Sequence, residues 1–157
     1  MTTRPPGLWV LRRLAEAGLL TPGAIFDFAA TALTRGVTLA ALAAFAARRR
    51  GAATALVDSG RPISFVELAA QCDRMAAVLR DAHGVVRGDP VGILCRNGAG
   101  LVRGVFAASR LGARVILLNP DMSGPQIVAL AARHHLRLVI AEADTEGRVA
   151  GAECPVL

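Results

Sequence analysis

The fold of this chain is decided by residues 91–104, which read VGILCRNGAGLVRG. Residues 91–95 form an unbroken apolar run, which is typical of a strand buried on both faces of a sheet. After the glycine-containing loop, residues 100–111 predict a helix that ends at Gly112. The alternation continues with an expected strand at residues 114–118, a helix at 124–134 and a strand at 136–141. This order predicts an α/β fold with an open parallel-type sheet and helices on both faces.

The residues before this unit carry the signals of a strand, a turn and a capped helix. Residues 53–58 form a short apolar run, and residues 59–62, Ser-Gly-Arg-Pro, predict a turn. Ser64 and Glu67 have the spacing of a capping box, in which each side chain binds a free backbone N–H group at a helix start. Apolar residues at three- and four-residue spacing continue that helix toward Gly84, which is expected to end it.

Residues 1–50 are expected to form an N-terminal helical segment, and residues 51–157 an incomplete α/β subdomain. The expected helices span residues 8–20, 22–34 and 38–50, the last with Thr38 as its N-cap. Arg48, Arg49 and Arg50 suit the negative end of the last helix dipole. The alternative is a basic amphipathic helix that rests on an anionic membrane surface.

Length and composition limit the classes of protein to which this chain can belong. The 157 residues are enough for one domain, and an apolar fraction of 54% with 19% charged residues excludes disorder. The longest apolar run covers residues 39–47, whereas a membrane span needs roughly 18 apolar residues or more. Three cysteines without Cys-x-x-Cys spacing, at positions 72, 95 and 154, favour a cytoplasmic location, with peripheral membrane contact as the alternative. The histidines, at positions 83, 134 and 135, lack metal-ligand spacing.

The basic residues exclude several chemistries. All 18 of them are arginine, so the chain contains no Walker A or Schiff-base lysine. The net charge of +6 is spread along the sequence, and six aromatic residues offer little stacking surface. We therefore expect no nucleic-acid partner.

The first candidate site is the loop at residues 97–104, because Gly98 and Gly100 match two glycines of a dinucleotide-binding fingerprint. The third glycine position falls on Arg103, and the next strand ends at Asn119 rather than at an acidic residue. A tight strand-to-helix turn explains the same glycines.

A second candidate set consists of polar residues after the expected strands, namely Arg96, Asn97, Asn119 and Asp121. Ligands of open α/β sheets bind at the carboxyl ends of the strands. The structural alternative is that Asn97 and Ser123 cap helices and that Asn119-Pro120 begins a turn. The sequence shows no Ser–His–acid set, paired carboxylates or metal-ligand cluster.

Several short segments between residues 17 and 141 occur in a familiar order and spacing. They are ALVD (55–58), ISFVEL (63–68), RGD (87–89), VGILCRN (91–97), LGA (111–113), VILLNP (115–120) and GPQ (124–126), after an AGLL-P lead-in (17–22). In this order they resemble the N-terminal portion of AMP-forming acyl-CoA synthetases, the adenylate-forming superfamily, and in particular bacterial long-chain fatty-acid–CoA ligases. The chain departs from that pattern at Phe65, where tyrosine is common, at Gly100, where an acidic residue is common, and at Gln126, where glutamate is frequent.

The resemblance implies activation of a fatty acid with ATP and Mg²⁺ to an acyl-adenylate and transfer of the acyl group to coenzyme A. The family's phosphate loop, which ends in Pro-Lys-Gly, and its C-terminal catalytic lysine do not occur in these 157 residues. We therefore assign no catalytic, cofactor-binding or metal-binding residue and expect this fragment to bind no cofactor alone. The resemblance implies a truncated or split ligase.

The alternatives are a non-catalytic interaction or membrane-docking module and a small dinucleotide-binding domain. The expected partner is a complementary ligase polypeptide or a second copy of the chain. A subdomain of this kind leaves an apolar surface and an unpaired strand edge, expected near residues 136–141 or at residues 155–157.

Overall fold

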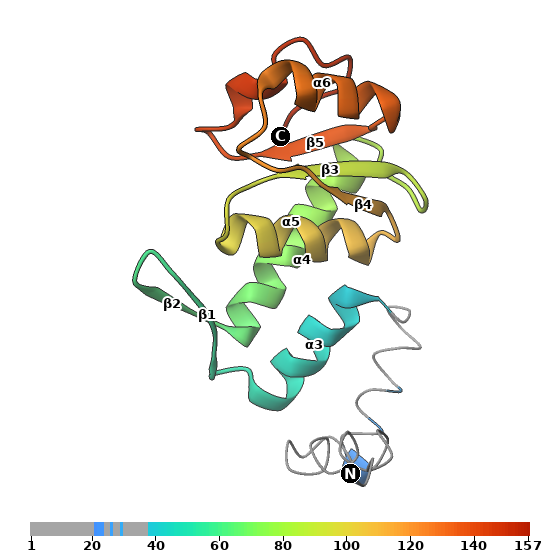
Figure 1. Ribbon diagram of the computed structural model, residues 1–157. Helices are drawn as coiled ribbons and strands as arrows, with labels where there is room; N and C mark the ends of the chain where they lie inside the picture. Colours follow the sequence, from blue (N-terminus) through green and yellow to red (C-terminus); the bar gives the residue numbers. More distant parts are fainter. Residues whose placement is uncertain (1–20, 24–25, 27–28, 30–37) are drawn as a thin grey trace, which may run out of the picture.

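The parallel sheet lies between helices on both faces, as the sequence predicts. The computed structural model describes residues 21–23, 26, 29 and 38–157. The helix expected over residues 8–20 lies outside these residues, as does most of the helix expected over 22–34. The three-stranded sheet consists of β3 (Pro90–Leu94), β4 (Arg114–Leu117) and β5 (Leu138–Ala141) in the order β4-β3-β5. Helix α6 (Gly124–Arg133) covers one face, and α4 (Phe65–Asp81) and α5 (Ala99–Arg110) cover the other (Figure 1).

Strand β3 pairs in parallel with both neighbours and supplies the centre of the core. Val91, Ile93 and Leu94 have no exposed surface, and complete burial of such a side chain stabilises a fold by about 1.5–3 kcal/mol. Val91 and Ile93 contact the cluster beneath α4 and α5, whereas Leu94 joins the cluster beneath α6. The alternating side chains of one strand therefore hold both helical layers.

Helix α4 begins with the predicted capping box. The Glu67 carboxylate accepts a hydrogen bond from the Ser64 backbone N–H (2.9 Å), and the Glu67 N–H donates to the Ser64 hydroxyl (3.3 Å). After α4, Gly84 has a φ of +62°, and its N–H donates to the Arg80 carbonyl. That left-handed conformation favours glycine and closes the last turn, as expected.

The predicted turn at residues 59–62 is shorter than expected. Ser59 and Gly60 both have positive φ, which defines a two-residue hairpin turn. The hairpin joins β1 (Thr54–Asp58) to β2 (Arg61–Ser64), a strand that the sequence analysis missed. Pro62 lies in this strand opposite Val57, because a strand with one unpaired edge tolerates a residue without an N–H group.

Helix α3 (Leu39–Arg50) packs against α4 and α5 through its alanine-rich face. Its last turn holds Arg48, Arg49 and Arg50, where their charge suits the helix dipole. Thr38 occupies the N-cap position, but its hydroxyl makes no capping bond. The Leu39 N–H instead donates to the Ser109 hydroxyl of α5 (3.1 Å), so a distant residue caps this helix.

The chain after β5 returns to the sheet through a short 3₁₀-helix, η1 (Glu146–Val149). Val156 then pairs in parallel with Val139, and two hydrogen bonds of 2.9 Å join Val139 to Pro155 and Leu157. The outer edge on this side is therefore the terminal segment and not β5, whereas β4 forms the opposite edge. None of the helices formed by the described residues has the length and apolar character of a membrane span.

We predict that Gly92→Ala destabilises the sheet. A Cβ atom at this position would lie 2.7 Å from Leu136 Cδ1 and 3.1 Å from Leu118 Cδ1, inside the cluster beneath α6. Such overpacking costs about 1–3 kcal/mol, which urea unfolding would measure. Gly147→Ala is the matched control, because a Cβ atom there meets nothing within 4 Å. Equal stability of the two variants would contradict the packing described here.

Candidate functional site

The carboxyl ends of the three parallel strands meet at one edge of the sheet, where Arg96 is the central side chain. Its Nε atom lies 2.9 Å from Asp144 Oδ2, and its Nη1 atom lies 3.8 Å from Asp121 Oδ1. The structure therefore brings together two residues of the predicted polar set, Arg96 and Asp121. It adds Asp144, which the sequence analysis missed because the residue lies 48 positions along the chain.

Arg96 and Asp144 shift each other's pKa values. The hydrogen bond from Arg96 lowers the pKa of the Asp144 carboxyl group below its ordinary value of 3.8, and the same bond raises the pKa of Arg96. Both side chains are more than half exposed, so solvent screens the interaction.

Glu142 and Thr145 tie the end of β5 to the end of β3. The Glu142 Oε2 atom accepts a hydrogen bond from the Arg96 backbone N–H (3.1 Å). The fully buried Thr145 hydroxyl lies 2.8 Å from the Leu94 carbonyl oxygen and accepts a hydrogen bond from the Glu142 N–H. These bonds fix the loop after β5 beside the loop after β3.

The expected structural roles, a turn at Asn119 and a helix cap at Ser123, are present, whereas Asn97 does not cap a helix. Asn119 Oδ1 accepts a hydrogen bond from the Asp121 N–H (2.9 Å) and forms the expected turn, while Ser123 and Gln126 form a capping box. Asn97 is exposed and is not the N-cap of α5, because Gly98 holds that position.

The glycine loop faces carboxylates instead of an open anion site. A Cβ atom at Gly100 would lie 2.6 Å from Glu142 Oε1, and one at Gly98 would lie 3.1 Å from Asp58 Oδ1. Two carboxylates beside the N-terminus of α5 repel a pyrophosphate group. Helix α5 approaches β3 closely at Gly104 and not at Arg103, because a Cβ atom added to Gly104 would lie 3.2 Å from Ile93 Cδ1. The geometry therefore favours the tight-turn explanation over dinucleotide binding.

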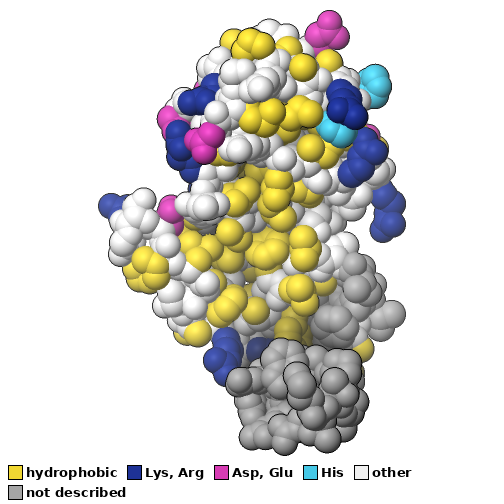
Figure 2. Space-filling view, in the orientation of Figure 1, with side chains coloured by type: hydrophobic (Ala, Val, Ile, Leu, Met, Phe, Trp, Pro, Cys, Tyr) yellow, Lys and Arg dark blue, Asp and Glu magenta, His cyan; other side chains and the backbone are white. Residues whose placement is uncertain are grey.

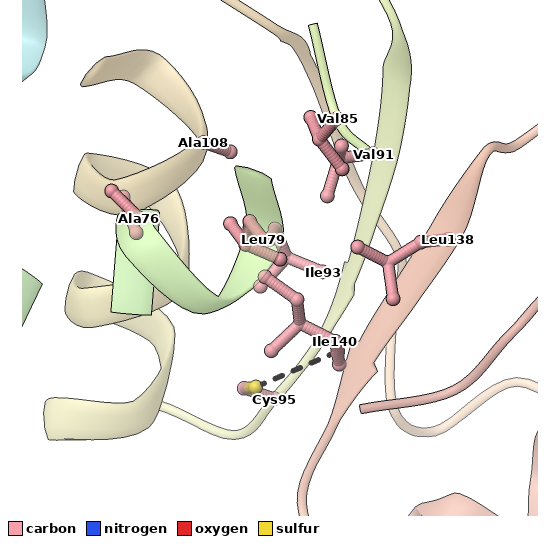
Figure 3. Close-up of a cluster of buried hydrophobic side chains, with 10 residues drawn as sticks. Ala76, Leu79, Val85, Val91, Ile93, Cys95, Ala108, Leu138 and Ile140 are labelled. Atoms are coloured by element: carbon pink, nitrogen blue, oxygen red, sulfur yellow. Dashed lines mark hydrogen bonds between the residues drawn. The ribbon is translucent and has the colours of Figure 1, made fainter. Parts of the chain in front are cut away.

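The cysteine nearest this edge is a core residue. The Cys95 thiol donates to the Ile140 carbonyl oxygen (3.8 Å), as Figure 3 shows. Burial raises the pKa of Cys95 to about 11, so the thiol is protonated at neutral pH and is a poor nucleophile. Within residues 21–23, 26, 29 and 38–157, no three His, Cys, Asp or Glu side chains are grouped as a metal site.

Comparison with known proteins defines the class as the adenylate-forming superfamily. The model of the AMP-binding enzyme family matches residues 43–155, which is more than half of the chain, and the protein belongs to that family.

Three relatives illustrate the range of the family. The 4-chlorobenzoate–CoA ligase of Arthrobacter sp is 34% identical over 101 residues, which cover 63% of this chain and 19% of the ligase. The N-terminal subdomain of Klebsiella oxytoca NpsA, solved with anthranilyl-AMSN, is 26% identical to this chain with a TM-score of 0.68. The match covers 76% of this chain and 30% of the NpsA chain. A protein assigned as a long-chain-fatty-acid CoA ligase, from Rhodopseudomonas palustris, is 26% identical with a TM-score of 0.67, and the match covers 73% of this chain and 29% of that one.

The chain spans less than a fifth of the length of the curated relatives it matches. The part that this chain shares with the family is the α/β unit described above. That unit is one part of the larger adenylate-forming fold.

We predict that Arg96→Gln raises the pKa of Asp144 toward 3.8, because the charged hydrogen-bond donor is lost. Since the pKa of this carboxyl group is lowered in the folded state, the pair stabilises the protein above the ordinary pKa. That contribution disappears as the pH falls through the lowered value. Carboxyl NMR titration and unfolding at several pH values measure both effects. Arg80→Gln is the control, because its partner is Asp81, and an unchanged Asp144 titration in Arg96→Gln would refute the pairing.

Proposed function

We propose that this chain is the N-terminal part of a fatty-acid–CoA ligase that activates its acid substrate as an acyl-adenylate. The observation that carries the proposal is the family match over residues 43–155, together with segments similar to those of bacterial fatty-acid–CoA ligases. The likeness to the Rhodopseudomonas palustris protein supports the same assignment. ATP, Mg²⁺ and coenzyme A would be bound by the complete enzyme.

The acid substrate distinguishes this proposal from its rivals within the family. The relatives include 4-chlorobenzoate–CoA ligase and tyrocidine synthase 3, so an aryl acid or an amino acid is the competing substrate. A panel of fatty, aryl and amino acids, tested with the same preparation, separates the three classes.

We propose that the activity requires a complementary ligase polypeptide. A sequence without lysine supplies none of the phosphate-binding ammonium groups that the resemblance implies. At the carboxyl edge of the sheet, Arg96 interacts with Asp121 and Asp144, and the Glu142 carboxylate is bound to a backbone N–H group. These groups serve mainly to hold the loops together.

An exposed apolar surface supports the proposal that this chain binds a partner polypeptide. Figure 2 shows hydrophobic side chains gathered across the middle of one face of the molecule. Large apolar side chains with more than half of their surface exposed include Leu42 of α3, Val57 of β1, Val66 of α4 and Leu117 of the edge strand β4. Apolar surface of this kind marks interfaces.

The purified chain alone is predicted to form no acyl-adenylate. It contains no lysine, and so it lacks the ammonium groups that, by the resemblance, would stabilise charge on the transferred adenylyl group. The assay is exchange of labelled pyrophosphate into ATP with a fatty acid, with the chain alone and mixed with a ligase polypeptide that carries the family's phosphate loop and C-terminal lysine. Exchange is expected only in the mixture and only with fatty acids. Exchange by the chain alone contradicts the need for a partner, and exchange driven by aryl or amino acids contradicts the substrate class.

We further expect the purified chain to self-associate in the absence of its partner, because its apolar surface remains exposed. Sedimentation velocity at several micromolar protein, with and without that complementary polypeptide, measures this. Replacement of Leu117 by Ser on the free edge of β4 should reduce association, whereas His134→Ser, on the turn after α6, should leave it unchanged. A single monomeric species that binds no hydrophobic dye would refute the expectation.

A further inference from the structure

Three arginines lie at the edge of the sheet where the parallel strands begin, opposite the edge that holds Arg96. Arg87 lies in the loop before β3, Arg114 is the first residue of β4, and Arg137 directly precedes β5. All three residues are exposed. Figure 2 shows arginine and histidine side chains along the side of the molecule on which the strands begin. We call this surface the amino edge.

The backbone holds these arginines beside one another. The Arg114 and Arg137 N–H groups each donate to a carbonyl oxygen beside the start of β3, at 2.8 Å. The strand order is β4-β3-β5, so the Cα atoms of these two residues lie about 10 Å apart, two strand spacings. Arg137 Nη2 also donates to the His83 carbonyl oxygen (3.1 Å). A Cβ atom added at Gly112 would lie 3.3 Å from Arg87 Cγ, so Arg87 lies over the loop before β4.

The charges of the amino edge are mostly positive. Within the part of the chain that the structure describes, no carboxylate lies within salt-bridge distance of Arg87, Arg114 or Arg137. Asp89 is the one carboxylate in the loops that lead into the three parallel strands. Its Oδ2 atom accepts a hydrogen bond from the Val86 N–H (2.9 Å). Three positive charges therefore stand against one negative charge.

The other carboxylates near the sheet do not change this balance. Two acids of α4 pair with arginines, Asp81 with Arg80 and Asp73 with Arg110. The carboxylates after the strands lie at the opposite end of the sheet, namely Asp121, Glu142 and Asp144. The two ends of the sheet therefore differ in charge, and the field of the protein turns the amino edge toward an anionic surface.

The loop before β3 presents an apolar side chain beside these charges. Val86 exposes 61% of its surface, whereas its neighbour Val85 is buried in the cluster beneath α4 and α5. The Gly88 N–H donates to the Gly112 carbonyl oxygen (2.9 Å), which fixes the loop against the start of β4. At a membrane surface, an apolar side chain can enter the boundary between head groups and acyl chains while arginines next to it contact lipid phosphates.

We propose that the amino edge docks on an anionic phospholipid bilayer, with Arg87, Arg114 and Arg137 at the lipid phosphates and Val86 at the head-group boundary. The loops that lead into the strands contain no phenylalanine, tryptophan or tyrosine, so they offer little surface for stacking on nucleic-acid bases. The contact goes beyond the ligase activity proposed above and needs neither ATP nor an acid substrate. Its failure would therefore leave that proposal unchanged.

The test is flotation of the purified chain with phospholipid vesicles, because a bound chain rises with the lipid and an aggregated chain does not. Vesicles of phosphatidylcholine with about 30% phosphatidylserine are expected to carry the chain, and vesicles of phosphatidylcholine alone are not. Binding should fall at least tenfold between about 0.1 M and about 1 M salt, because salt screens the attraction. Equal binding to both kinds of vesicle would refute the proposal.

Arginine variants locate the contact. One arginine near an anionic surface strengthens binding about fivefold, so Arg87→Gln, Arg114→Gln and Arg137→Gln should each lower the partition coefficient by that factor. The triple variant should abolish flotation. The matched control removes the same charge from the end of α3, by replacement of residues 48–50 with Gln, and should lower binding less than twofold. A loss in the control as large as in the amino-edge triple variant would show attraction by net charge or by α3 and would refute the site.

The remaining results decide the kind of partner. Val86→Ser should weaken binding about threefold, because less apolar surface enters the boundary, whereas Val66→Ser, an exposed valine of α4, should leave it unchanged. Unchanged binding of Val86→Ser would overturn the role of the apolar side chain. Binding to polyglutamate or to a single-stranded oligonucleotide as tight as to the anionic vesicles would overturn the assignment to a bilayer. Thermal unfolding of each variant checks the fold, and Arg114→Gln tests the surface even if the triple variant does not fold.

Discussion

The double-sided burial of β3 is the constraint on which the rest of the structure depends. Val91 and Ile93 face α4 and α5, and Leu94 faces α6, so a single four-residue stretch needs cover on both faces. The strand also hydrogen-bonds to a neighbour on each side, which leaves none of its polar backbone unpaired at the centre of the sheet. Both helical layers and both flanking strands follow from this requirement.

The same constraint explains glycines that otherwise suggest a nucleotide site. Gly92 leaves space for Leu136 and Leu118 beneath α6, and Gly104 lets α5 approach Ile93 from the other face. Gly100 allows the Glu142 carboxylate to reach the loop after β3. Close approach of backbone to side chain, and not contact with a phosphate, accounts for the glycine spacing at this loop.

Local sequence signals predicted much of the fold, whereas contacts between distant residues escaped them. Three signals were predictable because each depends on residues a few positions apart. They are the apolar run of β3, the capping box of Ser64 and Glu67, and the end of α4 at Gly84. Strand β2 was missed because Pro62 is typical of a turn. The capping of α3 by Ser109 and the approach of Asp144 to Arg96 join residues 70 and 48 positions apart, and no local pattern marks such pairs.

The segments that identify the family are those that build the sheet. The run VGILCRN is β3 and the start of its loop, VILLNP is β4 and the start of its turn, and ISFVEL is the end of β2 with the capping box of α4. Their side chains pack, cap or form turns, so the likeness they carry is a likeness of architecture. A family defined by residues of this kind shares its fold while its members differ in the acid they activate, as the names of 4-chlorobenzoate–CoA ligase and 2-succinylbenzoate–CoA ligase illustrate. Side chains with no part in holding the sheet are therefore the ones that can differ between members of the family without loss of the fold.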